Sequence, residues 1–427
     1  MLHALSESQR AVWIAQALEP DNPAYNIAEY LEITGPLDVD KMAEAQRRLV
    51  HEVDALRLVF RNVAGEPYQS IVSSALLRWE PVLIDVSGET HPRATATEWM
   101  QRDLETPLEV TAGVLFSFIL FRLGPESHFW YQRFHHVMMD ATGGALLAQR
   151  LAALYTSLAA GVDAEPYRAG SVLELLAGEA AYLTSDAAVR DKDYWLGRLR
   201  SLPEAVTLSG RPAIPGGRRR RRVLYLPMAV MSVLRDVASD QGDGLATLFL
   251  ALGAIIVHRR TGAEEFPLGV TVTGRVGRAL RPIAGMAANT LPLIATLSHR
   301  AKLGEVVGGL GRGFRQLLRR QRYPYSRLRH DLGMPSTAGG YGPLINLMFY
   351  DYDLAFGQCT VASHNLSNGP VDELSINVCD RYDDRGYRID IDGNAAHYNE
   401  IDLELIAANF EGLCCSVATR IDRWNNA

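Results

Sequence analysis

The chain has 427 residues, of which 48% are hydrophobic and 22% are charged. This length exceeds the size at which one hydrophobic core stops growing, so two packed lobes are expected, and the composition excludes a disordered, collagen-like or coiled-coil protein. The formal net charge of −6 gives no reason to expect a nucleic acid as the partner.

The hydrophobic pattern predicts no membrane span. The longest apolar run, Leu245 to Val257, has 13 residues, fewer than the roughly 18 that a transmembrane helix requires, and it predicts a buried helix. At the start of the chain no basic segment precedes an apolar block, so we expect no signal peptide. These features predict a cytoplasmic protein without membrane contact.

The first part of the chain predicts helices and strands in alternation. Helical spacing of apolar residues predicts a helix from Leu37 to Val50, and alternation predicts a strand from Leu56 to Phe60. The β-rich runs Gly113 to Leu123 and His128 to Phe134 flank a turn sequence, which predicts adjacent antiparallel strands. A strong helical pattern then runs from Ala145 to Ala159. The polar residues between this strand and this helix lie at the end of a sheet, where sites are commonly built.

A polar stretch with glycine and proline, 161–171, precedes a helical region from Val172 to Leu199. We place the lobe boundary near residue 175, with a first lobe of 1–175 and a second lobe of 176–427. The second lobe is predicted to contain strands at Val223–Leu226, Phe266–Thr273, Leu291–Thr296, Leu344–Tyr350, Ser375–Cys379 and Tyr387–Ile391, and a final helix at Glu400–Ile421. Strands mixed with helices in both halves predict an α/β or α+β protein.

Two further features are predicted to be structural. The run Arg218 to Arg222 predicts a solvated loop or strand edge, and the alternative is a docking patch for an acidic partner. The cysteines, Cys359, Cys379, Cys414 and Cys415, lack the spacing of a zinc site or a disulfide framework. We expect reduced, buried thiols.

The segment Phe134 to Ala141 carries two adjacent histidines and an aspartate four residues after the second. Neighbouring side chains in an extended strand point to opposite faces, so His135 and His136 cannot easily share one metal ion. No HExxH motif or cysteine cluster supplies further ligands, and no metal site is predicted. We expect one histidine to face an open site and the other to pack inward, with Asp140 anchoring the turn.

This segment resembles the HHxxxDG motif of the condensation domains of non-ribosomal peptide synthetases, with Ala141 where the family has glycine. Other segments resemble motifs of the same family in the same order. They are Leu5–Trp13, Pro20–Asn26, Asp54–Phe60, Gly285–Leu293, Arg320–Tyr325, Gly342–Tyr352 and Asn368–Asp372. The last two are especially similar to the condensation enzymes of enterobactin and vibriobactin assembly.

The resemblance implies two chloramphenicol-acetyltransferase-like lobes in a V-shaped pseudo-dimer, with the histidine motif at the seam of a central tunnel. It implies that an acyl or peptidyl carrier protein presents an acyl thioester on its 4'-phosphopantetheine arm at one mouth. The amine acceptor enters at the other mouth, and the product is an amide. The chain itself is expected to bind no cofactor. Similarity to aryl-siderophore enzymes implies an aryl or otherwise capped acyl donor.

The implied reaction demands little of the protein, because a thioester is already an activated acyl donor. Holding the two reactants together and excluding water can supply several kcal/mol. An α-amine with a pKa of about 7.7 to 8.0 must bind in its neutral form. A neutral imidazole with a pKa of about 6.5 can accept a hydrogen bond or a proton from the amine. We therefore predict that His136 positions the amine or acts as the general base.

The resemblance also suggests roles for the neighbours of His136. His135 is given a structural role, and Asp140 is given an architectural role in which it pairs with Arg275 from the second lobe. The alternative for Arg275 is a solvated surface charge. Residues that would line the tunnel are Gly143, Gly144, Asn289 and Asn346, with strand packing as the alternative for Asn346.

Ala141 is the main departure from the family pattern. Glycine after the aspartate allows close backbone approach or a positive φ, whereas alanine adds a methyl group and restricts the backbone. Either the tunnel is reshaped around this methyl group, with Gly143 and Gly144 supplying the missing freedom, or catalysis is impaired.

Three functions remain open. The first is a condensation enzyme that is free-standing or leads a longer synthetase, and that receives its substrates in trans because the chain shows no carrier or adenylation segment. The second is an acyltransferase that uses acyl-CoA or an alcohol acceptor. The third is a non-catalytic recruiting domain, although domains of that sort usually lose the second histidine, which is present here as His136.

Overall fold

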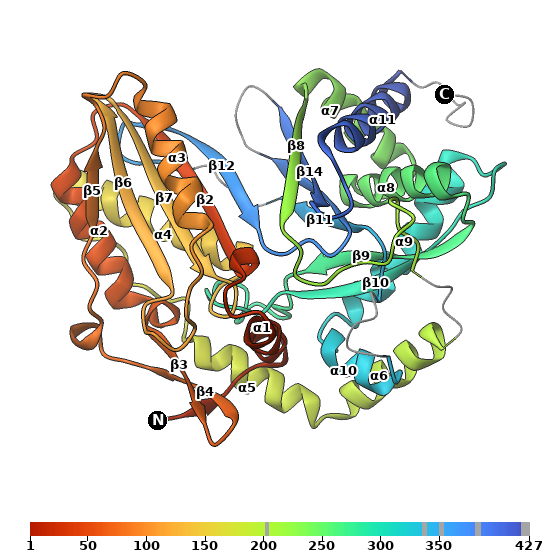
Figure 1. Ribbon diagram of the computed structural model, residues 1–427, viewed down its shortest axis with the longest axis horizontal. Helices are drawn as coiled ribbons and strands as arrows, with labels where there is room; N and C mark the ends of the chain where they lie inside the picture. The colour runs from red at the N-terminus through yellow and green to blue at the C-terminus, as the bar shows by residue number, and fades with distance from the viewer. Residues whose placement is uncertain (201–204, 335–339, 350–353, 381–385, 420–427) are drawn as a thin grey trace. The chain divides into compact units, whose positions relative to one another are not determined.

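The computed structural model describes residues 1–200, 205–334, 340–349, 354–380 and 386–419. The chain divides into two compact units, each built from several stretches of sequence (Figure 1). Unit 1 comprises Met1–Tyr182, Arg275–Ala288 and Asp351–Gly369, and unit 2 comprises Leu183–Gly274, Asn289–Tyr350 and Pro370–Ala427. The predicted boundary near 175 falls inside helix α5 (Val172–Leu183), and two stretches from beyond it belong to unit 1.

A five-stranded sheet, in the order β12-β2-β7-β6-β5, forms the centre of unit 1. Its strands are β2 (Asn26–Thr34), β5 (Val82–Asp85), β6 (Phe116–Gly124), β7 (Ser127–His135) and β12 (Thr360–Asn368). The antiparallel pairing of β6 with β7 confirms the predicted hairpin. Strand β12 comes from far along the chain and pairs antiparallel with β2 at the edge of the sheet.

Helices cover both faces of this sheet because its side chains alternate. Trp130 belongs to the core that includes Met42 of α2 and Leu151 of α4, whereas its neighbour Phe129 belongs to the core that includes Met100 of α3. The helices of unit 1 are α1 (Glu7–Leu18), α2 (Val39–Glu52), α3 (Pro92–Leu104), α4 (Ala141–Ala160) and α5. The predicted helix at 37–50 is confirmed as α2, and the pattern at 145–159 belongs to the longer α4.

Smaller elements complete unit 1. The strands β1 (His3–Ala4), β3 (Leu58–Val63) and β4 (Glu66–Ile71) form a three-stranded sheet, and the 3-10 helices are η1 (Pro23–Tyr25), η2 (Asp54–Arg57) and η3 (Ser74–Leu76). The strand predicted from Leu56 begins only at Leu58. The preceding residues form η2, and the Arg57 guanidinium at its end donates to the Val50 carbonyl near the end of α2.

Unit 2 contains a six-stranded sheet in the order β10-β9-β11-β13-β14-β8. Its strands are β8 (Arg219–Leu226), β9 (Glu265–Val272), β10 (Asn289–Thr296), β11 (Leu344–Met348), β13 (Leu374–Asp380) and β14 (Tyr387–Asn394). Its helices are α6 (Asp186–Leu199), α7 (Met228–Asp240), α8 (Leu245–Thr261), α9 (Leu303–Arg319), α10 (Tyr325–Asp331) and α11 (Glu400–Ala418). The mixed arrangement confirms the predicted α/β class. Tyr350 and Ile421, at the ends of two predicted elements, lie outside the described residues.

Helix α8 is the buried helix that the apolar run predicts. Twelve successive residues, Thr247 to His258, are buried in it. Among the described helices, none is by itself long and apolar enough to cross a membrane. Helices α7 and α8 reach that length and composition only as a pair, and a bend of 98° separates them.

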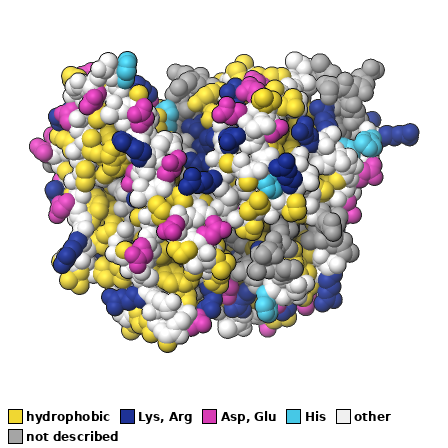
Figure 2. All heavy atoms as spheres, viewed as in Figure 1, with side chains coloured by type: hydrophobic (Ala, Val, Ile, Leu, Met, Phe, Trp, Pro, Cys, Tyr) yellow, Lys and Arg dark blue, Asp and Glu magenta, His cyan; other side chains and the backbone are white. Residues whose placement is uncertain are grey.

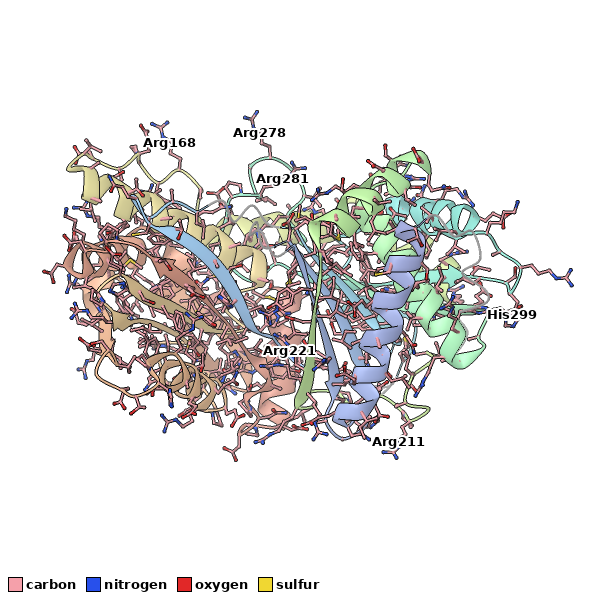
Figure 3. All side chains as sticks on the ribbon, turned by 90° about the horizontal axis from the view of Figure 1, so that it is seen from above. Arg168, Arg211, Arg221, Arg278, Arg281 and His299 are labelled. Carbon is pink, nitrogen blue, oxygen red and sulfur yellow. The ribbon has the colours of Figure 1, made fainter. Side chains whose placement is uncertain are left out.

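The arginine run shows that a charged run need not be a solvated face. Strand β8 lies at the edge of its sheet, which confirms the predicted strand edge, and Arg220 and Arg222 are exposed. Arg221 differs: its guanidinium pairs with buried Asp390 and Asp392 of β14 at 3.0 and 2.6 Å (Figure 3). The prediction of a solvated run is therefore wrong for Arg221, because its side chain points to the opposite side of the strand from its neighbours.

The surface charges are mixed in sign. Basic and acidic side chains are interspersed over the face seen in Figure 2, which agrees with the small net charge.

All four cysteines are free thiols, and Cys359, Cys379 and Cys414 are buried. Cys415 is exposed, so the expectation of burial is wrong for it. Its neighbour Cys414 belongs to the buried face of α11, and adjacent residues of a helix point in different directions.

Candidate functional site

The histidine pair lies where β7 ends and the chain turns toward α4. The His136 backbone N–H donates to the Tyr25 carbonyl at 2.8 Å, and the Met138 N–H donates to the His135 carbonyl at 3.0 Å. Val137, Met138 and Met139 have no exposed surface and belong to the core of unit 1. The three apolar residues therefore anchor the turn, so that the polar residues on either side of them have fixed positions.

Asp140 ends this turn and begins α4. Its backbone is extended, and its carboxylate accepts a hydrogen bond from the Gly143 N–H at 2.8 Å, which is the geometry of a helix N-cap. The carboxylate also accepts from the N–H groups of Ala287 and Ala288, both at 2.9 Å. Helix α4 begins at Ala141, four residues before the predicted start, because this cap satisfies its first turn.

Arg275 forms the ion pair with Asp140 that the resemblance implied. Two guanidinium nitrogens lie 2.8 and 3.1 Å from the two carboxylate oxygens, and the guanidinium also donates to the carbonyls of Ile283 and Gly285. Arg275 is 4% exposed, so its alternative interpretation as a solvated surface charge is wrong. It also belongs to unit 1, although its number lies within the predicted second lobe.

The carboxylate of Asp140 remains ionised in this buried position. Burial acts to raise its pKa, but the charge and hydrogen bonds of Arg275, together with the backbone N–H donors, outweigh burial and lower the pKa below its ordinary value.

The segment after Arg275 carries two other arginines. Arg278 and Arg281 are exposed and project outward in Figure 3, so only Arg275 of the three contributes to the site.

His135 is buried and engaged at both ring nitrogens. Its Nδ1 accepts a hydrogen bond from the Val137 N–H at 3.1 Å, so Nε2 carries the proton and donates to the Gln16 side-chain oxygen at 3.0 Å. Burial, with smaller contributions from His136 and Arg133, lowers the pKa of His135 to about 3. Gln16 in turn donates to three backbone carbonyls after α1. This imidazole therefore links β7 to the N-terminal segment in its neutral form.

Among the residues that the structure describes, none forms a hydrogen bond with Nε2 of His136. Its Nδ1 lies 2.9 Å from the Met139 carbonyl, which can only accept, so the proton resides on Nδ1 and the lone pair on Nε2. Burial lowers the pKa of His136, against the opposing effects of the Asp140 carboxylate and the Met139 carbonyl. The side chain is half-buried, in contrast to that of His135. The geometry thus presents a neutral imidazole with a hydrogen-bond acceptor at Nε2.

Ala141 fits its position without strain. It is the first residue of α4, and among the described non-glycine residues only Ala64 has a positive φ. Alanine is favourable in a helix, and no left-handed conformation is required here. The departure from the family glycine therefore leaves the turn geometry intact.

The two glycines that follow are buried in the first turn of α4. A Cβ on Gly143 would lie 2.3 Å from the Met139 sulfur and 3.0 Å from the backbone N and O of Gly285. Glycine at 143 is thus required for close packing of α4 against the segment after Arg275. A Cβ on Gly144 would meet only ordinary contacts at 3.7 Å or more.

The two predicted asparagines lie in unit 2 and are bound to protein groups. The Asn289 side chain donates to the carbonyls of Gln321 and Tyr323 and accepts from the Tyr325 N–H, so it holds the turn before α10. Asn346 donates to the Asn377 side chain on the neighbouring strand at 3.1 Å.

Sequence reasoning missed three groups that shape the site. They are the Met139 carbonyl, the Gln16 side chain and Gly369, which follows β12 in unit 1. A Cβ on Gly369 would lie 3.0 Å from Cδ2 of His136. The motif Asn368–Asp372 marked this region, but only the pairing of β12 with β2 brings it to the histidine.

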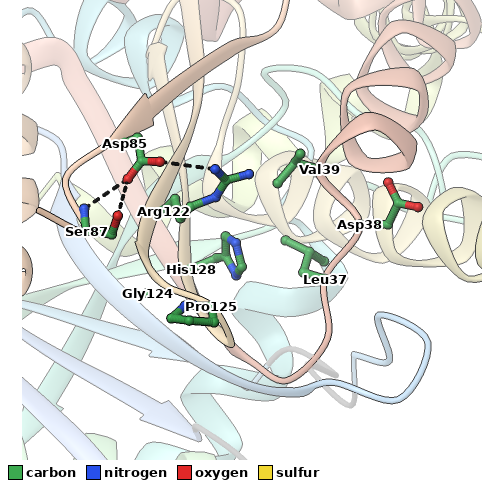
Figure 4. A pocket seen from close by; sticks show the side chains of 9 residues that line it. All are labelled: Leu37, Asp38, Val39, Asp85, Ser87, Arg122, Gly124, Pro125 and His128. Atoms are coloured by element: carbon green, nitrogen blue, oxygen red, sulfur yellow. Dashed lines mark hydrogen bonds and ion pairs between the residues drawn. The ribbon is translucent and has the colours of Figure 1, made fainter.

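A separate depression of about 520 Å³ lies at the other end of β7 (Figure 4). It is lined by Leu37, Asp38, Val39, Asp85, Ser87, Arg122, Gly124, Pro125 and His128, all outside the predicted site. Asp85 accepts from the Arg122 guanidinium at 3.1 Å and from the Ser87 hydroxyl at 2.6 Å, so its charge is compensated.

In the part of the chain that the structure describes, no group of three histidine, cysteine or acidic side chains could hold a metal ion.

Comparison with known proteins places this geometry in context. Residues 2–417 match the family model described as "Condensation domain". The chain is 38% identical to the dimodular nonribosomal peptide synthase of Bacillus subtilis (strain 168), over 94% of this chain and 17% of that protein. It is 28% identical to enterobactin synthase component F of Escherichia coli O157:H7, over 93% of this chain and 31% of that protein. The chain thus spans less than a third of each of these relatives.

Solved structures agree in fold. The chain has a TM-score of 0.92 and 36% identity to a variant of the starter condensation domain of rhizomide synthetase RzmA in complex with C8-CoA, over 98% of this chain and 95% of that one. This likeness confirms the predicted chloramphenicol-acetyltransferase-like fold class.

Proposed function

The chain belongs to the condensation-domain family, and we propose that it transfers an acyl group from a thioester to an amine acceptor to form an amide. The observation that carries this proposal is the imidazole of His136. Its Nδ1 proton is bound to the Met139 carbonyl, which leaves the Nε2 lone pair available to an incoming amine. Burial lowers its pKa and favours the neutral form that this role requires.

The reaction is an aminolysis. The neutral amine nitrogen attacks the thioester carbonyl carbon, and a new C–N bond forms as the carbonyl π electrons move to oxygen. Nε2 of His136 accepts a hydrogen bond or a proton from the attacking nitrogen. The C–S bond then breaks, and the proton passes to the departing sulfur, so that an amide and a thiol result. Positioning the amine supplies most of the rate gain, because the thioester is already activated.

The ion pair of Asp140 and Arg275 supports this role indirectly. It fixes the end of the turn that begins at His136, and it ties this turn to the backbone at Gly285. His135 fixes the start of the same turn through Gln16. We assign these three side chains a positioning role, because the contacts described for them are with protein groups.

We propose acyl or peptidyl carrier proteins as the partners, with the acyl group carried on 4'-phosphopantetheine. The basis is kinship with a nonribosomal peptide synthase and with enterobactin synthase component F. A second candidate donor is acyl-CoA, which the C8-CoA complex of the rhizomide starter condensation domain favours. Both donors present the same thioester to the amine, so the role of His136 is the same for each.

The test is turnover with matched donors. The same acyl group is offered on a carrier protein and on CoA, with an amine acceptor, and the amide product is measured by mass spectrometry. His136→Ala is expected to lower turnover about 100-fold or more, whereas the exposed His91→Ala serves as the control with wild-type turnover. Equal turnover of His136→Ala and the wild type would contradict the proposed role. Faster turnover of acyl-CoA would assign the donor to the second candidate.

The acyl group is tested in the same assay. Similarity to aryl-siderophore enzymes implies an aryl donor, whereas the solved neighbour holds a C8 chain. Carrier proteins loaded with an aryl group and with an octanoyl group are compared at equal concentration. Equal turnover would discard a preference for either class.

A further inference from the structure

Gly369 lies at the point where the late segment of unit 1 meets the histidine motif. Strand β12 pairs with β2, and β2 pairs with β7, so the residues at the end of β12 are brought to the end of β7. Asn368 is opposite Ile27 in the first pairing, and Asn26 is opposite His135 in the second. Gly369 therefore follows β12 directly beside the turn that carries His136.

The backbone of Gly369 has a conformation that only glycine adopts easily. Its φ is +102°, and its N–H donates to the Ser367 hydroxyl at 3.2 Å. A Cβ added here would lie 3.0 Å from Cδ2 and 3.5 Å from Nε2 of His136, and 3.6 Å from Ile27. The first of these distances is shorter than an ordinary carbon–carbon contact, so a side chain at position 369 would press on the imidazole.

The ring of His136 is held at its other edge by the Met139 carbonyl. A methyl group at position 369 would lie 3.0 Å from Cδ2, so the ring could not keep its present orientation without a shift. The bond to Met139 and the absence of a side chain at position 369 therefore both contribute to the ring orientation.

We propose that Gly369 is a positioning residue for His136: because it has no side chain, the imidazole keeps the orientation that presents Nε2 to the amine. This inference rests on the proposed function, since it assigns the amine to Nε2. It concerns a residue outside the histidine motif and more than two hundred positions away from it in the sequence.

The experiment compares two glycines that differ in what they touch. Gly369→Ala introduces backbone strain and a methyl group against His136. Gly113→Ala introduces comparable strain, because φ of Gly113 is +119°, but a Cβ there meets nothing within 4 Å. Thermal unfolding of both variants measures the strain, and this control separates strain from the contact with the imidazole.

The first readout does not depend on activity. In NMR spectra of the full chain with labelled histidine, Gly369→Ala is expected to shift the ring signals of His136, which are assigned by their loss in His136→Ala. Gly113→Ala is expected to leave them unchanged. Unchanged His136 ring signals in folded Gly369→Ala would overturn the proposal.

The second readout is the division between kcat and KM. Because a misplacement of about 1 Å can cost about 100-fold in rate, the smaller shift forced here is expected to lower kcat about tenfold. KM for the acyl donor is expected to stay within about twofold of the wild type. A wild-type kcat in Gly369→Ala would refute the positioning role even if the ring signals shift.

A second variant keeps the test valid if Gly369→Ala does not fold. Ser367→Ala removes the hydroxyl that holds the Gly369 N–H and adds no bulk. It is expected to shift the same ring signals and to lower kcat about threefold, because a hydrogen bond that fixes the Gly369 backbone is lost. Unchanged ring signals and kcat in this variant would again overturn the proposal.

Failure of this inference is distinguishable from failure of the proposed function. If His136→Ala keeps wild-type turnover, the proposed function fails, and with it the positioning of an amine at Nε2. If His136→Ala loses turnover while Gly369→Ala keeps both the ring signals and kcat, only the role of Gly369 fails.

Discussion

Arg275 and Asp140 are separated by 135 residues in the chain and form a two-pronged ion pair with N–O distances of 2.8 and 3.1 Å. Their side chains are 1% and 2% exposed. The pair also forms hydrogen bonds with backbone groups of the segment 283–288 and with the Gly143 N–H. The pair thus joins the turn after β7 to a segment from the middle of the chain.

Removing one partner of this pair leaves an uncompensated buried charge. Arg275→Met is therefore expected to lower the free energy of unfolding by about 3–5 kcal/mol. Urea denaturation followed by tryptophan fluorescence measures the change. Arg278→Met is the matched control, because Arg278 is exposed, and it is expected to change stability by less than about 0.5 kcal/mol. Equal loss in both variants would show that the ion pair does not carry the effect.

The ionised state of Asp140 makes stability depend on acid pH. Its folded pKa lies below its ordinary value, so the stability it contributes is fully present above its unfolded pKa of about 3.9 and is lost as the pH falls through the lower folded pKa. Urea midpoints between pH 5 and pH 2.5 are expected to fall more steeply for the wild type than for Asp140→Asn. Parallel curves would contradict this assignment.

His135 is a base, whereas Asp140 is an acid, but its lowered pKa also makes the protein less stable at acid pH. Its folded pKa of about 3 lies below its unfolded value of about 6.5, so between these values the unfolded chain binds the extra proton. Stability is therefore expected to decline as the pH falls from 6.5 toward 4, by up to about 1.4 kcal/mol per unit of pH. His135→Gln, which keeps a polar side chain beside Gln16, should flatten this decline in urea titrations. A slope equal to that of the wild type would show that another group is responsible.

Ala141 is expected to be neutral for activity. Because position 141 has ordinary helical geometry, Ala141→Gly should leave turnover within about twofold of the wild type. The same variant should lower the free energy of unfolding by about 0.5–1 kcal/mol, because glycine has more backbone freedom to lose than alanine. Product formation and urea midpoints check both values. A large gain in turnover would instead support the interpretation that the alanine methyl group impairs catalysis.

The arginine run offers a comparison between adjacent residues. Arg221→Met leaves buried Asp392 without its guanidinium partner and leaves Asp390 with Arg388 alone, and it should cost about 3–5 kcal/mol of stability. Arg220→Met changes an exposed side chain of the same strand and should cost less than about 0.5 kcal/mol. Thermal unfolding of the two variants decides the matter. Similar melting temperatures would mean that the buried ion pairs contribute little.

Strand β2 was not predicted from the sequence, because charged residues interrupt its pattern of buried residues. Strand β2 contains Glu29 and Glu32 within a largely buried run, and Glu32 is compensated by Arg93 and His364. Those partners come from α3 and β12, so the alternation that predicts a strand is interrupted by residues whose pairing is tertiary. Helix α9 was hidden by its glycines, which disfavour a helix, although Val306, Val307 and Leu310 recur at helical spacing on its buried face.

The sequence by itself determined the elements whose signal is local. The hairpin of β6 and β7, the helices α2 and α8 and the polar junction at 135–140 follow from periodicity and turn residues, because side-chain direction depends on near neighbours along the chain. The motif around His136 and Asp140 was also evident from the order of its residues.

Only the tertiary structure decided what those residues touch. The bond from His136 to Met139 selects the ring nitrogen that carries the proton, and the pairing of β12 with β2 brings Gly369 beside the ring. The burial of Arg275 and of Arg221 likewise depends on partners far away in the sequence. Such contacts depend on the free energy of burying and pairing groups that local patterns do not bring together.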